Sequence, residues 1–266
     1  MISIVITSYN RRNIVSDAIE SALSGIRTTG FNEVILVDDC STDGTLDYIR
    51  QAFSGAIADG QLKLTSTPHN LGVTGAKNTG YSLAKGPWVG FLDSDDTLLQ
   101  DQVTPAAALL SSNPGIPIAF FRCQDLAGHL IGTYFSEPQW LDIARYVRNT
   151  SYGEALTFIN KAVVPQPPYI DWLRGYEGLG CLRIIRDSGP ALLSPICLRL
   201  YNQVLETRLS TLKGGLLKRL PLLAKGHRLV LKEFGNYLSP TRRFRLYLVA
   251  TIYAFVGSIE SRRFIP

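Results

Sequence analysis

The sequence contains few of the residues that mark metal clusters or disulfide frameworks. Its four cysteines form neither a CxxC pair nor a zinc-like spacing: they are Cys40, Cys123, Cys181 and Cys197. We therefore expect reduced thiols without a metal, as in a cytosolic protein. Three histidines, His69, His129 and His227, lie far apart with no partner pattern, so they do not indicate a catalytic or metal site.

Two common nucleotide-binding motifs are also absent. The chain lacks GxxxxGK[ST], and GxGxxG does not follow the first predicted strand, which argues against a P-loop NTPase and a Rossmann dehydrogenase. The opening residues, from Met1 into 2–6, are typical of a strand rather than a signal peptide. Residues 246–259 are uncharged, but these fourteen residues fall short of the roughly 20 that span a bilayer.

The 266 residues, 45% hydrophobic and 18% charged, fit one large globular domain with an appendage. Charge is unevenly distributed along them. Residues 1–199 carry 15 Lys or Arg against 19 Asp or Glu, whereas residues 200–266 carry 12 against 3. The basic tail predicts an anionic partner: a membrane surface, a nucleic acid or the acidic body of the chain. Residues 212–234 mix leucines with Lys and Arg, as interfacial helices do.

Short, continuous apolar runs predict strands buried on both faces of a parallel sheet. They are residues 2–6, 33–37 and 88–92, with a further strand expected at 118–121. Helical spacing between them indicates an α/β fold. One such helix, over residues 14–23, is expected to end at Gly25 as a C-cap, whereas residues 130–175 look irregular.

Each of the three runs ends in polar residues, and in α/β sheets ligands bind at the carboxyl ends of the strands. The most unusual of these ends is Asp93-Ser94-Asp95-Asp96, because crowded carboxylates repel unless a cation lies between them. A calcium loop beginning at Asp39 is excluded by Arg50 in its twelfth position. Capping of a helix N-terminus would explain one of these acidic residues but not all three. The cluster therefore predicts a site for Mn²⁺ or Mg²⁺, which bind carboxylates together with substrate phosphates.

Three spaced motifs resemble the family 2 glycosyltransferases of the GT-A fold. They are "ISIVITSYNRR", "EVILVDDCSTDGT" and "NLGVTGAKNTGYSLAKGPWVGFLDSDD". The resemblance implies an inverting, metal-dependent transfer of a sugar from a nucleoside diphosphate sugar. It also implies a mostly parallel or mixed central sheet flanked by helices over residues 1–204, with a donor half at 1–112 and an acceptor half at 113–204. The basic, partly hydrophobic region 205–266 would follow as helices.

The resemblance also assigns residues to the donor. Thr7, Ser8, Tyr9 and Asn10 would line the nucleotide, with Tyr9 near the base. Asp39 would bind the base edge, supported by Asp38. Gly72, Lys77 and Asn78 would lie along the nucleotide, with Lys77 where relatives usually have Arg. Asp93 would face the ribose or the metal, and Ser94 would be a further donor-binding residue. Asp93, Asp95 and Asp96 would hold the metal.

Inversion requires a general base that takes the proton of the acceptor hydroxyl. In the family this base is an acid of a Glu-Asp pair, and here the matching positions are Glu177 and Gly178. Glu177 is the predicted base and Asp171, six residues earlier, is its rival; the alternative for Glu177 is a surface ion pair with Arg174 or Arg183. Trp172 is equally compatible with a sugar-stacking role and a packing role.

The resemblance and the tail together predict a saccharide or lipid-linked saccharide acceptor in bacterial surface polysaccharide or glycolipid assembly. The expected location is the cytoplasm, with peripheral contact between 205–266 and the inner membrane face. Ordinary helices packed on the body, with their basic side in water, would explain the tail equally well. The aromatic residues of the tail form no evident stacking face, so the sequence does not predict nucleic-acid binding. Two other functions stay open: a degenerate nucleotide-sugar-binding subunit, suggested by Gly178, and a sugar nucleotidyltransferase, which normally has a glycine-rich loop in place of Thr7–Asn10.

Overall fold

The computed structural model describes residues 1–28, 31–148, 153–202 and 215–263. The chain divides into two compact units. The first consists of Met1–Asp142 and Asn149–Gln203, and the second of Ile143–Arg148 and Val204–Pro266.

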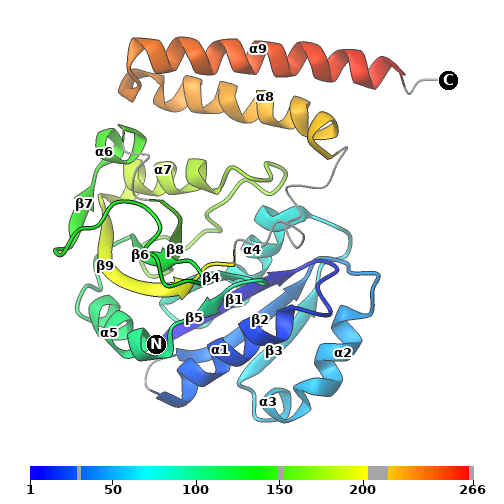
Figure 1. The fold of residues 1–266 in the computed structure, drawn as a ribbon, viewed down its shortest axis with the longest axis vertical. Coiled ribbons are helices and arrows are strands. Elements are labelled where there is room, and N and C mark those ends of the chain that lie inside the picture. The colour runs from blue at the N-terminus through cyan, green and yellow to red at the C-terminus, as the bar shows by residue number, and fades with distance from the viewer. Residues whose placement is uncertain (29–30, 149–152, 203–214, 264–266) are drawn as a thin grey trace. The chain divides into compact units, whose positions relative to one another are not determined.

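The first unit is built on one mixed β-sheet (Figure 1). Its strands are β1 (Ile2–Ser8), β2 (Phe31–Asp38), β3 (Leu62–Ser66), β4 (Trp88–Asp93), β5 (Thr97–Leu98), β6 (Ile118–Gln124), β7 (Gln139–Leu141), β8 (Ala155–Asn160) and β9 (Ala191–Leu200). They lie in the order β3-β2-β1-β4-β8-β6-β9-β5, and β7 pairs with β9. The strands β3, β2, β1 and β4 are mutually parallel, and β8 runs antiparallel to both β4 and β6.

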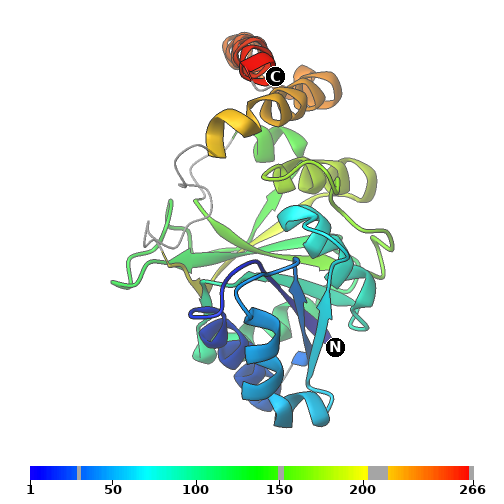
Figure 2. The same ribbon diagram turned by 90° about the vertical axis from the view of Figure 1, so that its right-hand side faces the viewer.

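Helices cover both faces of this sheet (Figures 1 and 2). They are α1 (Val15–Thr28), α2 (Thr45–Ala52), α3 (Ser54–Ala58), α4 (Gly72–Leu83), α5 (Gln100–Ser111) and α7 (Glu177–Ser188). Helices α1 and α5 pack against each other on one face, and α4 packs on β1 and β2 from the other. The middle of β2, from Val34 to Val37, is fully buried. The four strands predicted from apolar runs are therefore confirmed, as is the mixed α/β fold.

Two local predictions are wrong. Gly25 does not end its helix, because α1 continues to Thr28. A Cβ at Gly25 would come 2.5 Å from the ring of Phe31, so the glycine is explained by the close approach of α1 to β2. Residues 130–175 are not irregular throughout: β8 lies inside the sheet between β4 and β6. Its partners are distant in sequence, and a strand of this kind is stabilised by its neighbours more than by local propensity.

The second unit is helical. It contains α6 (Ile143–Arg148), α8 (Gly215–Phe234), a short 3₁₀ turn, η3 (Gly235–Tyr237), and α9 (Pro240–Arg263). The predicted helical tail is confirmed where it falls within the described residues, and positions 205–214 lie outside them. None of the described helices is both long and apolar enough to cross a membrane.

Candidate active site

Three strand ends meet at one edge of the sheet. The register pairs Ser8 of β1 with Asp38 of β2, and Thr7 of β1 with Asp93 of β4. The convergence expected from the sequence is confirmed, because these strands are parallel neighbours whose carboxyl ends face the same way. Thr7 is half-buried and Ser8 is buried; among the described residues the Ser8 hydroxyl finds no hydrogen-bond partner.

The loops that follow β1 and β2 hold each other in place. Asn10, in a left-handed conformation with φ 53°, accepts a hydrogen bond from the amide of Thr42 at 2.8 Å and donates its own amide to the Ser41 hydroxyl at 2.8 Å. Asp38 accepts from the amide and the hydroxyl of Ser41. Asn10 and Asp38 thus fix the loops beside Tyr9, which is half-buried.

The buried carboxylate of Asp39 joins β2 to the start of α4. It accepts from the amides of Leu71 and Gly72, both at 2.7 Å, and from the Thr67 hydroxyl at 2.8 Å. A carboxylate has about four lone-pair positions, so one position of Asp39 is left for a further donor. Gly72 has φ +79°, and a Cβ there would lie 2.1 Å from Nε of Arg174. The terminal Nη2 of Arg174 donates to the Asn70 carbonyl at 2.8 Å.

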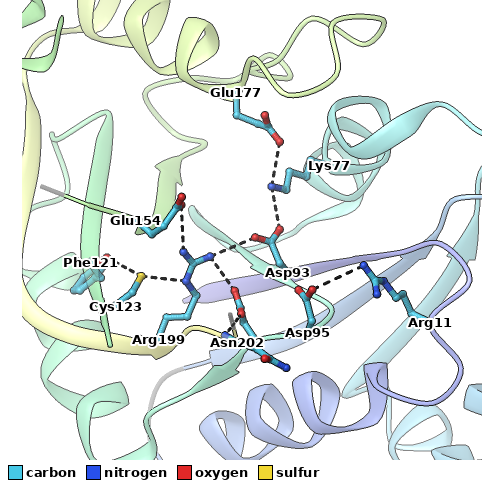
Figure 3. A network of polar contacts seen from close by, with 11 residues as sticks. Arg11, Lys77, Asp93, Asp95, Phe121, Cys123, Glu154, Glu177, Arg199 and Asn202 are labelled. Atoms are coloured by element: carbon cyan, nitrogen blue, oxygen red, sulfur yellow. Dashed lines mark hydrogen bonds and ion pairs between the residues drawn. The ribbon is translucent and has the colours of Figure 1, made fainter. Parts of the chain in front are cut away.

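Asp93, the last residue of β4, and Asp95 lie against different cations (Figure 3). Asp93 lies 3.2 Å from Nζ of Lys77 and 3.3 Å from the guanidinium of Arg199, on β9. Burial alone would raise the pKa of Asp93, but these two cations outweigh it and lower the pKa. Ser94 is buried next to it.

Asp96 is held inside the protein. Its side chain is fully buried, accepts from the Asn202 amide at 2.8 Å and lies 3.1 Å from Arg199. Burial raises the pKa of Asp96 to about 7 despite the neighbouring guanidinium. Arg199 itself is 4% exposed in its side chain and also donates to Sγ of Cys123 at 3.1 Å (Figure 3). Arg199 therefore joins β4, β6 and β9.

Asp95 has a more accessible carboxylate than Asp96. Its side chain is 18% exposed and lies 3.8 Å from Arg11, the one cation paired with it in the described part of the chain. Burial and the nearby Asp93 raise the pKa of Asp95, and Arg11 opposes this. A cation placed against Asp95 would favour the charged carboxylate.

The expectation that Asp93, Asp95 and Asp96 surround one ion stays a prediction. Across the described ranges, no group of three or more His, Cys, Asp or Glu side chains could hold a metal. Arg199 lies against both Asp93 and Asp96, and Lys77 lies against Asp93. Asp95 still fits a cation that takes one protein carboxylate and completes its shell with phosphate and water oxygens, as Mg²⁺ does.

Lys77 connects the end of β4 to the start of α7. It is buried within α4, and its Nζ lies 3.2 Å from Asp93 and 3.5 Å from Glu177, the first residue of α7 (Figure 3). Burial alone would lower the pKa of Lys77, but the two carboxylates outweigh it and raise the pKa. Glu177 is thus oriented towards the site by an ammonium group, and its side chain is 28% exposed.

The rival base, Asp171, makes different contacts. Its carboxylate accepts from the Asn78 amide at 2.5 Å, and its carbonyl accepts from the Thr74 hydroxyl at 2.8 Å. The buried Asn78 also exchanges hydrogen bonds with the backbone of Tyr169, at 2.7 and 3.1 Å. Asn78 therefore fastens the segment before α7 to α4. Trp172 in this segment is 52% exposed.

Sequence reasoning missed Arg199 and Arg11. Arg199 belongs to β9 and follows the acidic cluster by more than a hundred residues, so no local spacing connects them. The available signal was a lone cation in the apolar run Ile196-Cys197-Leu198-Arg199-Leu200, since a charged residue in a buried strand requires a partner.

Comparison with known proteins identifies the family. A model described as glycosyl transferase family 2 matches residues 3–150, more than half of the chain. The chain belongs to this family. The resemblance seen in the three sequence motifs is therefore confirmed.

Three curated relatives are similar to parts of this chain. The succinoglycan biosynthesis protein ExoO of Rhizobium meliloti (strain 1021) is 39% identical over 102 residues, 38% of this chain and 27% of ExoO. The putative teichuronic acid biosynthesis glycosyltransferase TuaG of Bacillus subtilis (strain 168) is 35% identical over 103 residues, 39% of each chain. The chain thus spans well under half the length of these two relatives. WfgD of Escherichia coli, a diphosphoundecaprenol β-1,3-glucosyltransferase, is 27% identical over 188 residues, 71% of each chain.

Solved structures of glycosyltransferases share the fold. S. aureus TarS 1–349 in complex with UDP-GlcNAc is similar with a TM-score of 0.66 and 17% identity, over 96% of this chain and 72% of TarS. The mannosyltransferase PcManGT of Pyrobaculum calidifontis, in complex with GDP-Man and Mn²⁺, has a TM-score of 0.60 and 15% identity, over 96% and 69%. These likenesses confirm the predicted GT-A fold of this family 2 glycosyltransferase.

Proposed function

We propose that this chain transfers a sugar from a nucleoside diphosphate sugar to an acceptor hydroxyl, with inversion, in bacterial surface polysaccharide or glycolipid assembly. The observation that carries the proposal is Lys77, which lies between Asp93 on the donor side and Glu177 on the acceptor side. ExoO, TuaG and WfgD are named for polysaccharide or glycan synthesis, which supports this class of reaction.

On the donor side, the loops after β1 and β2 would form the nucleotide site. Thr7, Ser8, Tyr9 and Asn10 would line it, and the remaining acceptor position of Asp39 would bind the base edge. Asp93 would face the ribose of the donor. Asp95 would hold Mn²⁺ or Mg²⁺ together with the donor phosphates, and such an ion, when bound, lowers the negative charge of the diphosphate leaving group.

On the acceptor side, Glu177 would accept the proton of the attacking hydroxyl. Lys77 would keep the Glu177 carboxylate aimed at the crevice, and the same ammonium would limit the repulsion between Glu177 and Asp93. Asp171 is less suited to this step because its carboxylate already accepts from Asn78. Asn78 would then act by positioning the acceptor segment rather than by touching the nucleotide.

The acceptor would be a saccharide or a lipid-linked saccharide, and the enzyme would work in the cytoplasm at the inner membrane face. WfgD acts, by its name, on a diphosphoundecaprenol-linked acceptor, which supports the lipid-linked class. The positive charge of residues 200–266 suits an anionic membrane surface better than nucleic acid, for which aromatic residues would have to form a stacking face.

The proposal is tested with a panel of nucleoside diphosphate sugars. We expect one donor to raise the melting temperature more with Mn²⁺ than without it, because ligands that bind only the folded state stabilise it. The same donor should be converted slowly to nucleoside diphosphate by transfer to water. Asp95→Asn should remove the Mn²⁺-dependent part of the shift, while Asp101→Asn, an acidic residue on α5, should leave it unchanged.

A second function has one observation in its favour. Gly178 stands where relatives have the second acid of the Glu-Asp pair, as expected for a nucleotide-sugar-binding subunit that has lost catalysis. Donor-dependent stabilisation without release of nucleoside diphosphate, with every acceptor and with water, would favour this alternative. No stabilisation by any nucleotide sugar would contradict both functions.

A further inference from the structure

The helical hairpin of the second unit has one packed face and one exposed face. Helices α8 and α9 lie side by side (Figure 1). Between them, Ala224 and Ala250 are buried, and His227 stacks on Tyr253 with ring centroids 5.8 Å apart. A Cβ at Gly257 would come 2.6 Å from Pro221, so this glycine permits a close approach of the two helices.

The opposite face of α9 exposes large apolar side chains. They recur every three or four residues, which places them on one stripe of the helix. The stripe consists of Phe244 (67% exposed), Tyr247 (63%), Leu248 (46%), Ile252 (48%) and Phe255 (65%). We call these five residues the α9 stripe. Soluble surfaces rarely carry so many contiguous apolar side chains, and such a patch marks an interaction site.

The α9 stripe is bordered by cations. Arg243 and Arg245 are the chain neighbours of Phe244, so they project about 100° to either side of it on the helix. Residues 219–257 contain seven Lys or Arg and a single acid, Glu233. At one end of the stripe a hollow of about 590 Å³ is lined by Phe244, Tyr247, Lys232 and Arg243 together with Leu231, Leu238 and Pro240.

The exposed apolar stripe and the cations beside it together distinguish between a lipid bilayer and an acidic protein as the partner. A bilayer interface takes a helix with an apolar face a few ångströms deep while Arg side chains extend to the lipid phosphates. An acidic protein would match the charges, but it would not by itself explain five exposed apolar residues. Spanning the bilayer is not an option for the described helices.

We propose that the α9 stripe is a docking surface for an anionic lipid bilayer, with α9 lying in the plane of the interface. The sequence favoured residues 212–234 for such contact, but in α8 Leu220 and Phe234 are 5% and 0% exposed. The exposed apolar surface is on α9. This inference deepens the proposed function, on which it rests, because it names the surface that would bring the enzyme to a lipid-linked acceptor.

The test is flotation of the full chain with vesicles of phosphatidylcholine, alone or mixed with phosphatidylglycerol. We expect the protein to float with the anionic vesicles, and less so as salt increases. Phe244→Ser combined with Ile252→Ser should reduce the bound fraction about tenfold or more, because each buried apolar side chain contributes strongly to partition. Arg243→Glu with Arg245→Glu should abolish the preference for the anionic lipid.

The matched control is Leu126→Ser, which removes an apolar side chain that is 60% exposed in the first unit and should not affect flotation. Equal flotation of the Phe244/Ile252 variant and the parent would overturn the inference. The inference would also be overturned if the α9 stripe held a dimer together or packed against another part of the chain. In that case the Phe244/Ile252 variant would dissociate or open, and no vesicle binding would be seen. Donor-dependent stabilisation is measured on the same samples. If the parent protein does not float but binds the donor, the inference is contradicted and the proposed function is not. If it floats but does not bind any donor, the proposed function alone is contradicted.

Discussion

The ammonium of Lys77 lies 3.5 Å from the carboxylate of Glu177. These residues belong to α4 and α7, which are separated by about a hundred positions in the chain, and the same ammonium lies 3.2 Å from Asp93. The contact therefore links the residue proposed to accept a proton to a residue proposed to bind the donor. Neither carboxylate has to be neutral for the two to share the crevice, since the cation between them compensates both.

Replacing Glu177 tests the base assignment. Glu177→Gln keeps the shape but cannot accept a proton, so we expect turnover to fall about a hundredfold or more while donor affinity is unchanged. Initial rates with a matched donor and acceptor, alongside donor-dependent thermal shifts, measure the two effects. Asp171→Asn is the comparison variant and should lose less turnover. Near-normal turnover in Glu177→Gln would move the base elsewhere.

Arg199 is expected to position the acidic loop. Arg199→Met leaves Asp96 buried without its cation, and breaking a buried pair costs about 3–5 kcal/mol of unfolding free energy. Arg199→Lys keeps the charge, but a single ammonium cannot replace a guanidinium that reaches Asp93, Asp96 and Cys123 together.

We therefore expect Arg199→Lys to fold and to raise the KM for donor about tenfold, with a smaller change in kcat, because the loss concerns positioning rather than chemistry. Urea unfolding and steady-state kinetics measure these effects. The control is Arg186→Lys, which alters a pair with the neighbouring Asp187 on the surface. A donor KM like that of the parent enzyme would show that Arg199 contributes to folding alone.

The sequence predicted those parts of the site that depend on local patterns. Each apolar run that ends in Thr7, Asp38 or Asp93 is a buried strand, and a parallel sheet necessarily brings such ends together. The family motif also placed Glu177 near the donor residues, which matches its contact with Lys77.

The same reasoning did not predict contacts between residues that are distant in sequence. Asp93, Asp95 and Asp96 predicted one metal site because they are neighbours in sequence. In the structure the amide of Asp96 donates to the carbonyl of Asp93 at 3.2 Å, and the three carboxylates contact different sets of cations. Arg199 arrives from another strand and determines the partner of Asp96. A contact of this kind leaves no trace in local spacing.

Replacing Asn78 tests whether this residue positions the acceptor segment or contacts the nucleotide. Its side chain exchanges hydrogen bonds with the backbone of Tyr169 and donates to the carboxylate of Asp171. Asn78→Ala should therefore cost about 1–3 kcal/mol of unfolding free energy through unpaired buried groups. We expect the KM for acceptor to rise while the donor-dependent thermal shift stays as in the parent. A matched variant is Thr79→Ala, which removes a hydrogen bond inside the same helix. Loss of the donor-dependent shift in Asn78→Ala would restore the nucleotide role.

A buried carboxylate far from these groups predicts how stability depends on pH. Glu33 is 4% exposed and accepts from Lys63, from the Lys85 amide at 2.6 Å and from the Ser3 hydroxyl at 2.7 Å. Burial alone would raise the pKa of Glu33, but the contacts with Lys63 and the other donors outweigh it and lower the pKa. The folded state therefore binds this proton more weakly than the unfolded chain does.

For a lowered pKa, the stabilisation is fully present above the unfolded value of about 4.3 and is lost as the pH falls through the folded value. Glu33→Gln should thus cost about 1–3 kcal/mol of unfolding free energy near pH 7, and the difference from the parent should shrink as the pH falls below about 4. Urea unfolding across a pH series measures this, with Glu20→Gln on the exposed side of α1 as the control. A difference that stayed constant at every pH would mean that Glu33 stabilises the fold by shape and hydrogen bonding and not by its charge.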